Sequence, residues 1–130
     1  MVIDTSDLLA ILFQEADAMQ FAKAIATAPT RLLSAANLVE ASMVAESRAG
    51  TDGVRDLDLL VAKSKIEVMP VTVEQAELAR LAFRNFGKGR HRAGLNFGDC
   101  FSYALAKDTG EPLLFKGDDF NHTDIAVYSV

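Results

Sequence analysis

The chain begins Met1-Val2-Ile3-Asp4-Thr5-Ser6, and this stretch decides the fold. Two β-branched residues, Val2 and Ile3, predict a short buried strand that ends at the carboxylate of Asp4. Hydroxyl residues and an apolar run follow, so we expect a helix to begin near Ser6. In open α/β sheets, sites form at the carboxyl ends of the strands. Asp4 is therefore either a helix N-cap or part of a site at that edge.

Strand-like and helix-like patterns alternate along the rest of the chain. We expect strands at residues 2–4, 31–34, 67–71, 112–115 and 125–130, and helices at residues 6–14, 17–28, 35–49, 54–65, 72–86 and 97–109. Pro70 predicts an edge position for the third strand. The alternation favours parallel pairing with right-handed crossovers, which gives a three-layer α/β/α domain around a small central sheet.

Length and composition limit the class of protein. The 130 residues are 50% hydrophobic and 24% charged, which is typical of one globular domain covering residues 1–130. The chain has neither an apolar run long enough to span a bilayer nor a signal-peptide pattern. The single cysteine, Cys100, cannot form an internal disulfide and is expected to be a small buried residue. These features predict a cytoplasmic protein that does not bind a membrane.

Acidic residues fall where a parallel sheet would bring them to one edge. Asp4 ends the first strand, Glu40 lies in the second turn of the helix after the second strand, and Asp99 begins the last helix. Asp118 and Asp119 follow the strand at residues 112–115. Each acid could instead be a cap or a solvated residue, and a different strand order would separate them. Their convergence is a prediction from the topology.

Clustered carboxylates stay ionised when a cation lies among them. Hard oxygen ligands suit Mg²⁺ or Mn²⁺, whereas a zinc site would need nitrogen or sulfur, which only His91, His122 and Cys100 supply. His91 either contacts phosphate or is an ordinary loop residue, which we favour, and we interpret His122 as structural. Acid clusters that hold such ions activate water for phosphodiester hydrolysis. The net charge of −5 argues against a general nucleic-acid coat protein but is compatible with such an enzyme.

With these residues identified, the chain resembles PIN-domain ribonucleases, and more closely the VapC-type toxins of bacterial toxin–antitoxin pairs. The stretches that carry the resemblance are Val2-Ile3-Asp4-Thr5-Ser6, Ala36-Asn37-Leu38-Val39-Glu40, Leu95-Asn96-Phe97-Gly98-Asp99-Cys100 and Leu113-Leu114-Phe115-Lys116-Gly117-Asp118-Asp119-Phe120, with Thr123-Asp124-Ile125 beyond. They occur in the expected order and span nearly the whole chain.

The resemblance implies a PIN-like α/β/α fold and a magnesium-dependent endoribonuclease site. The acids carried over are Asp4, Glu40, Asp99 and one from the Asp118-Asp119 turn, where Asp119 matches best because it directly precedes Phe. Thr5 or Ser6 would hydrogen-bond a metal ligand or water. The expected mechanism is attack on an RNA phosphate by a water that Mg²⁺ activates, with neither a catalytic histidine nor a covalent nucleophile. One or two ions are compatible with this scheme.

The resemblance also implies partners. VapC-type proteins dimerise and are inhibited by a small antitoxin that inserts a segment into the acidic groove. The apolar helix residues near 8–13 and 54–61 are candidates for the dimer surface. The basic segment at residues 84–92 is either an RNA-binding rim, through Lys88, Arg90 and Arg92, or a salt-bridged surface that meets acidic antitoxin residues.

Two alternatives belong to different functional classes. The first is a non-catalytic PIN-like module whose acidic groove binds only protein. The second is a phosphatase of the haloacid-dehalogenase type, which needs an Asp-x-Asp pair at the end of the first strand. Ser6 stands two residues after Asp4, so the sequence disfavours the phosphatase.

Overall fold

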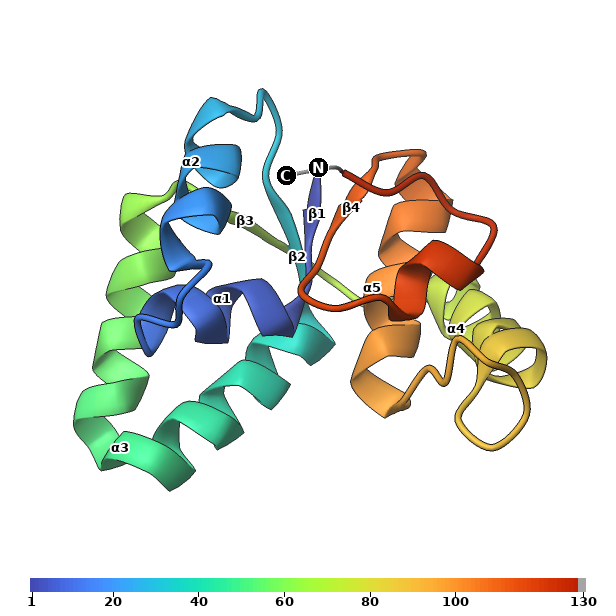
Figure 1. The fold of residues 1–130 in the computed structure, drawn as a ribbon, viewed down its shortest axis with the longest axis horizontal. Helices are drawn as coiled ribbons and strands as arrows, with labels where there is room; N and C mark the ends of the chain where they lie inside the picture. Colours follow the sequence, from blue (N-terminus) through green and yellow to red (C-terminus); the bar gives the residue numbers. More distant parts are fainter. Residues whose placement is uncertain (129–130) are drawn as a thin grey trace.

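A computed structural model describes residues 1–128. Its sheet has the order β3-β2-β1-β4, and all of the paired strands are parallel (Figure 1). The strands are β1 (Val2–Ile3), β2 (Leu32–Ser34), β3 (Glu67–Met69) and β4 (Leu113–Leu114). β3 lies at one edge and Pro70 follows it directly, as the sequence predicts.

Helices cover both faces of this sheet, which confirms the predicted three-layer α/β/α architecture. Figure 1 shows α1, α2 and α3 on one side and α4 and α5 on the other. Their bounds are α1 (Thr5–Leu12), α2 (Ala18–Thr27), α3 (Ala35–Lys63), α4 (Val73–Phe86) and α5 (Phe97–Thr109), and a 3₁₀ helix, η1, covers Asp119–His122. Among residues 1–128, none of the helices is long and apolar enough to cross a membrane.

Helix α3 contains a bend that the sequence predicts as a break between two helices. Gly50 has φ of 64° and ψ of −152°, a conformation that is readily available only to glycine. The helical turns continue on both sides, so the two helices expected at 35–49 and 54–65 are joined directly. The first half of α3 carries Glu40 away from β2, and the second half leads back to β3 (Figure 1).

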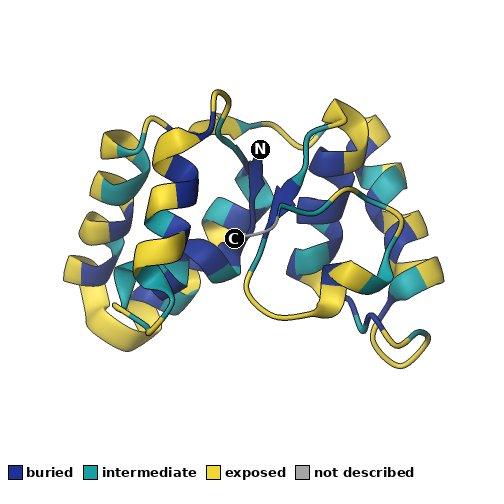
Figure 2. Ribbon diagram, turned by 45° about the horizontal axis from the view of Figure 1, so that its top comes forward, coloured by how far each residue is buried: buried dark blue, intermediate teal, exposed yellow. Residues whose placement is uncertain are grey.

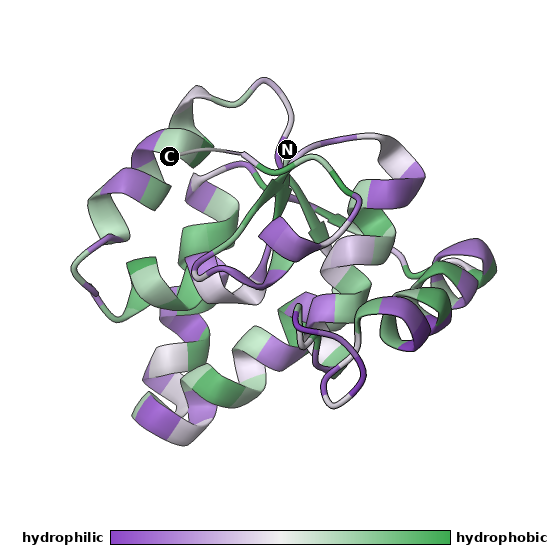
Figure 3. Cartoon of the chain, turned by 45° about the vertical axis from the view of Figure 1, so that its right-hand side comes forward, coloured by the Kyte–Doolittle hydropathy of each residue, from purple (hydrophilic) through white to green (hydrophobic). Residues whose placement is uncertain are grey.

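β1 and β4 are fully buried and β2 is largely buried, because successive side chains point to opposite sides and helices cover both, whereas β3 at the edge is mostly exposed. One apolar cluster, on the side of α1 to α3, contains Ile3, Leu8, Leu33, Leu57 and Leu114. The other, on the side of α4 and α5, contains Val2, Ala82, Leu95, Leu105 and Leu113. The central strands are accordingly dark blue in Figure 2 and green in Figure 3, which shows that they are buried and hydrophobic.

The fifth strand expected at residues 125–130 does not form within the part that the structure describes. Val127 makes a single parallel bridge to Leu113, and residues 129 and 130 lie outside the described residues. Just before the bridge, Asp124 accepts hydrogen bonds from the Tyr103 hydroxyl at 2.5 Å and from Lys107 at 2.9 Å. This anchor on α5 lets the segment meet β4 only briefly.

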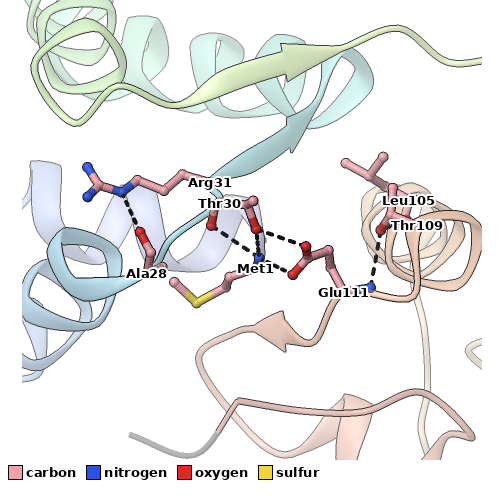
Figure 4. Close-up of polar contacts among 7 residues, drawn as sticks. All are labelled: Met1, Ala28, Thr30, Arg31, Leu105, Thr109 and Glu111. Carbon is pink, nitrogen blue, oxygen red and sulfur yellow. Dashed lines mark hydrogen bonds and ion pairs between the residues drawn. The ribbon is translucent and has the colours of Figure 1, made fainter.

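Polar contacts fix the N-terminal end of β1 (Figure 4). The α-amino group of Met1 donates to Glu111 Oε2 at 2.6 Å, to Thr30 Oγ1 at 2.9 Å and to the Thr30 carbonyl at 3.1 Å. These hydrogen bonds, first from the α-amino group and then from Thr30, lower the pKa of Glu111. The central strand is thereby tied to the segments that enter β2 and β4, at the end opposite Asp4.

Candidate active site

Asp4 has the capping role, and it lies at the sheet edge where a site is expected. It is the N-cap of α1, and its side chain accepts from the Ser6 backbone N–H at 3.2 Å. Hydroxyls hold both carboxylate oxygens, because Ser6 Oγ donates to Oδ2 at 2.7 Å and Ser102 Oγ donates to Oδ1 at 2.5 Å. Only 4% of Asp4 is exposed. The acid is therefore fixed at the carboxyl end of β1, where a site is expected.

Ser6 and Thr5, the two hydroxyl residues after Asp4, differ in their contacts. Ser6 Oγ donates to Asp4 and accepts from the backbone N–H of Lys116 at 3.0 Å, which joins the exit of β4 to Asp4. Thr5 Oγ1 instead donates to the backbone carbonyl of Asn37 at 3.3 Å and joins α1 to α3. Ser6 thus contacts the acid directly, and Thr5 supports the helices around it.

Asp99 and Glu40 meet where α3 approaches the first turn of α5. Asp99 forms a capping box with Asn96, in which each side chain accepts from the other residue's backbone N–H, at 3.1 and 2.9 Å. Gly98 is buried, and a Cβ atom there would overlap the Glu40 carboxylate. The Glu40 carboxylate therefore lies directly against the backbone beside Asp99, and only glycine leaves it this space.

The charges of the other three predicted acids act on Asp99. The pKa of Asp99 is raised to about 7, first by burial and then by the negative charge of Asp4, with smaller contributions from Asp119 and Glu40. A backbone hydrogen bond from Asn96 opposes this rise. Three acids that lie far from one another in the sequence thus contribute to the electrostatic environment of Asp99.

The two acids of the turn after β4 face different partners. Asp118 is exposed and accepts from Asn121 Nδ2 at 2.8 Å, and it contacts His122 Nε2 at 2.7 Å. These hydrogen bonds, from Asn121 first, lower the pKa of Asp118. Asp119, in contrast, is the acid of this turn whose charge acts on Asp99. The contacts of His122 agree with its interpretation as a structural residue.

The basic loop after α4 leaves its cationic side chains exposed. Lys88, Arg90 and Arg92 form no ion pair within residues 1–128, although the guanidinium of Arg90 lies 5.2 Å from the Phe83 ring centroid. His91 shapes this loop, since its Nδ1 accepts from the Ala93 backbone N–H at 3.0 Å. His91 lies in the loop, as the sequence predicts, and whether it also contacts phosphate stays a prediction.

Two residues of the site, Asn37 and Ser102, were missed at the level of sequence. Both are fully buried and lie beneath Asp4. Asn37 precedes Glu40 by three residues, and Ser102 follows Asp99 by three, so each shares a helix face with an acid. This spacing is the signal that identifies them once the acids are known.

The acids fit a hydrated hard cation better than a fully enclosed one. Within residues 1–128, no three acidic, imidazole or thiol side chains stand close enough to bind one ion together. Mg²⁺ usually keeps several waters and contacts one or two carboxylates, so this spacing is compatible with it. A cation would relieve the repulsion that raises the pKa of Asp99. Among residues 1–128, the carboxylate of Asp4 is held by the hydroxyls of Ser6 and Ser102 and forms no ion pair, so its negative charge is available to a cation.

Comparison with known proteins identifies the family. A family model described as the PIN domain matches residues 1–126. Ribonuclease VapC30 of Mycobacterium tuberculosis is 52% identical over 130 residues, which cover 100% of this chain and 99% of that protein. Ribonuclease VapC of Mycolicibacterium smegmatis is 55% identical over 126 residues, covering 97% and 98% of the two chains.

Solved structures share the fold at low sequence identity. The crystal structure of Mycobacterium tuberculosis VapC20, described as a sarcin-ricin loop cleaving toxin, has a TM-score of 0.75 at 19% identity and covers 92% of each chain. VapBC2 from Rickettsia felis, bound to a DNA fragment from its promoter, gives a TM-score of 0.76 at 11% identity and covers 98% of this chain and 96% of its own. Together with the full-length relatives, the family match shows that this chain belongs to the PIN-domain family, among its VapC ribonucleases.

Proposed function

We propose that this protein is a metal-dependent endoribonuclease that hydrolyses RNA phosphodiester bonds, and the toxin of a toxin–antitoxin pair. The observation that supports the proposal is that the negative charges of Asp4, Asp119 and Glu40 all act on Asp99 in the first turn of α5, where the Glu40 carboxylate lies against Gly98. The names of the full-length relatives, which are VapC ribonucleases, support the same activity.

Each acid has a defined task in this proposal. Asp4 and Asp99 bind the ion, Mg²⁺ or Mn²⁺, and Glu40 and Asp119 complete the negative site. A bound ion would supply Lewis acidity and a water of lowered pKa for attack on the phosphate. Two of the acids are already positioned in the free protein, because Ser6 hydrogen-bonds Asp4 and the capping box with Asn96 orients Asp99. Pre-positioned ligands reduce the reorganisation needed at the moment of reaction.

RNA would be held by the exposed cations of the basic loop. Lys88, Arg90 and Arg92 form no ion pair within residues 1–128 and follow α4 directly, beside the helix that carries Asp99. Phosphate groups bound there would be brought toward the acids, and their affinity would fall as salt is added. The overall negative charge then does not prevent binding of RNA, because the positive charge is concentrated in one loop.

We also propose a cytoplasmic toxin that an antitoxin inhibits by covering the acidic site. The Rickettsia felis neighbour is a VapBC complex, which supports a partner of this kind. A homodimer would use the face of α4 and α5, where Val73 is 76%, Phe83 41% and Phe97 78% exposed. The segments near 8–13 and 54–61 are less suitable than expected, because Leu8 and Leu57 are needed in the core. Light scattering of the parent and of Phe83→Asp tests this contact.

Substitution of the acids separates the nuclease from a non-catalytic binding module. Asp4→Asn and Asp99→Asn keep the shape of each side chain and remove its charge. With Mg²⁺ and a structured RNA, we expect each variant to cleave at least 100-fold more slowly than the parent, and chelation of the metal to stop cleavage by the parent. Asp58→Asn, an exposed substitution on α3, is the control. Equal cleavage by the parent and both site variants would refute the proposal.

A further inference from the structure

A buried polar network lies beneath Asp4 and joins the helices that carry the other acids. Ser102 on α5 and Asn37 on α3 are both 0% exposed. Ser102 Oγ lies 2.5 Å from Asp4 Oδ1 and 3.1 Å from Asn37 Oδ1. The Asn37 side-chain amide donates to the Gly98 carbonyl at 3.0 Å and to Thr5 Oγ1 at 3.3 Å. One pair of side chains thus connects α1, α3 and α5.

Each residue of this network lies about one helical turn from one of the predicted acids. Asn37 and Glu40 share a face of α3, and Ser102 and Asp99 share a face of α5. In each pair the neutral residue is fully buried and the acid is partly exposed. Asn37 and Ser102 therefore lie deeper in the protein than Glu40 and Asp99 on the same two helices. A shift of α3 relative to α5 would move the neutral pair and the acids together.

The Ser102 hydroxyl lies within hydrogen-bond distance of two acceptors. A serine hydroxyl has one proton, and both Asp4 Oδ1 and Asn37 Oδ1 accept only. The shorter contact is to the charged carboxylate, as expected for a charge-assisted hydrogen bond. Ser102 is also the only donor that the described residues offer to Asn37 Oδ1. Asn37 Oδ1, at the longer distance of 3.1 Å, holds the hydroxyl group from the side of α3.

We propose that Ser102, supported by Asn37, is a positioning residue that holds the Asp4 carboxylate for cation binding. This inference rests on the proposed function. Ser6 holds Oδ2 from the side of α1, and Ser102 holds Oδ1 from the side of α5, so the carboxylate cannot rotate freely. Hydrogen bonds to a ligating carboxylate orient it, and their removal typically weakens metal affinity or activity about 10- to 100-fold.

The test uses Mn²⁺ alone as the probe, with the full chain in a calorimetric titration. Ser102→Ala removes the hydroxyl without adding bulk, and we expect its Mn²⁺ affinity to fall about 10- to 100-fold. Cleavage at low Mn²⁺ should fall with it and recover as Mn²⁺ is raised, while the KM for RNA stays the same. Cys100→Ala is the matched control, because Cys100 is also buried on α5 and its thiol makes no hydrogen bond within residues 1–128. Its affinity should equal that of the parent.

Asn37→Ala provides a second variant and a test of coupling. It should weaken Mn²⁺ binding in the same direction, and the double variant should lose no more than the larger single loss, because both residues act through Asp4. Thermal unfolding of each variant verifies that it is folded. Single losses that multiply in the double variant would overturn the shared role.

The outcomes distinguish this inference from the proposed function. If the parent binds Mn²⁺ and Asp4→Asn does not, but Ser102→Ala binds within twofold of the parent, the positioning role is wrong and the nuclease proposal stands. If the parent binds no Mn²⁺, or Asp4→Asn binds as well as the parent, the metal site itself is wrong, and the positioning role falls with it.

Discussion

Gly98→Ala is the substitution for which the structure predicts the sharpest separation of activity from stability. The Cβ atom would overlap the Glu40 carboxylate, which lies against the backbone of Gly98. Because ordinary contacts of carbon atoms begin near 3.5 Å, that carboxylate must move by roughly 1 Å or more. The atoms in the way belong to the end of a flexible side chain, so the backbone of α5 can stay where it is.

The size of each effect follows from this geometry. A misplacement of about 1 Å in a catalytic site costs roughly 100-fold in rate, which corresponds to about 2.7 kcal/mol in activation free energy. Stability should change little, because alanine favours the helix over glycine by about 0.5–1 kcal/mol and offsets the cost of moving Glu40. We therefore expect kcat for RNA cleavage to fall about 100-fold, while the midpoint of thermal unfolding remains within a few degrees of the parent.

A double-mutant cycle identifies Glu40 as the cause. In a Glu40→Ala background the new methyl group has no carboxylate to displace, so adding Gly98→Ala should slow cleavage no further. Single-turnover cleavage of a labelled RNA and thermal unfolding are measured for all four proteins. Cleavage by Gly98→Ala within threefold of the parent would refute the reasoning. A further loss of cleavage rate in the Glu40→Ala background would also refute it, since the effect of Gly98→Ala would then not depend on Glu40.

Other perturbations test separate parts of the structure. Asp119→Asn should reduce cleavage at least tenfold and Asp118→Asn should not, because only Asp119 acts on Asp99; equal effects would contradict this assignment. Neutralising Lys88, Arg90 and Arg92 together should weaken RNA binding, and the slope of log affinity against log salt concentration should fall by the amount expected for about three phosphate contacts. Filter binding at several salt concentrations measures this slope, and unchanged binding would exclude the basic loop as the RNA-binding surface. Glu111→Gln should lower the free energy of unfolding by about 1 kcal/mol at neutral pH. Because the pKa of Glu111 is lowered in the folded protein, this difference in unfolding free energy should be present above the ordinary glutamate pKa of about 4.3 and should disappear as the pH falls through the folded pKa. Urea titrations at several pH values measure it, and a difference that stays constant with pH would refute the contribution of the Glu111 charge.

Much of the fold follows from local patterns in the sequence. β1 and β2, and the limits of α2, α4 and α5, fall within two residues of their predicted positions, because caps and breakers such as Asp17, Thr72 and Gly110 mark the helix ends. The segment after Asp124 was harder to predict. Its apolar, β-branched residues suit a strand, but a tertiary anchor on α5 limits it to one bridge within the described residues.

The candidate site shows a sharper division between what sequence can and cannot predict. The acids are recognisable because they follow strands or begin helices, and topology brings such positions together. Asn37 and Ser102 carry no comparable signal, since a polar residue in a helix is ordinarily solvated. Their role depends on how closely α3 approaches α5, which brings the Asn37 side-chain amide within 3.0 Å of the Gly98 carbonyl.

Capping and metal binding are not alternatives for Asp4 and Asp99, although the sequence presents them as such. A capping carboxylate uses some of its lone pairs on backbone N–H groups and keeps the others. Asp4 begins α1 and Asp99 lies in the first turn of α5, so both helix N-termini direct positive partial charge toward the acids. That charge favours the ionised carboxylates that a cation requires, against the burial that raises the pKa of Asp99. Helix initiation and the assembly of an acidic site are therefore achieved by the same side chains, which explains how so short a strand as β1 can carry the centre of the site.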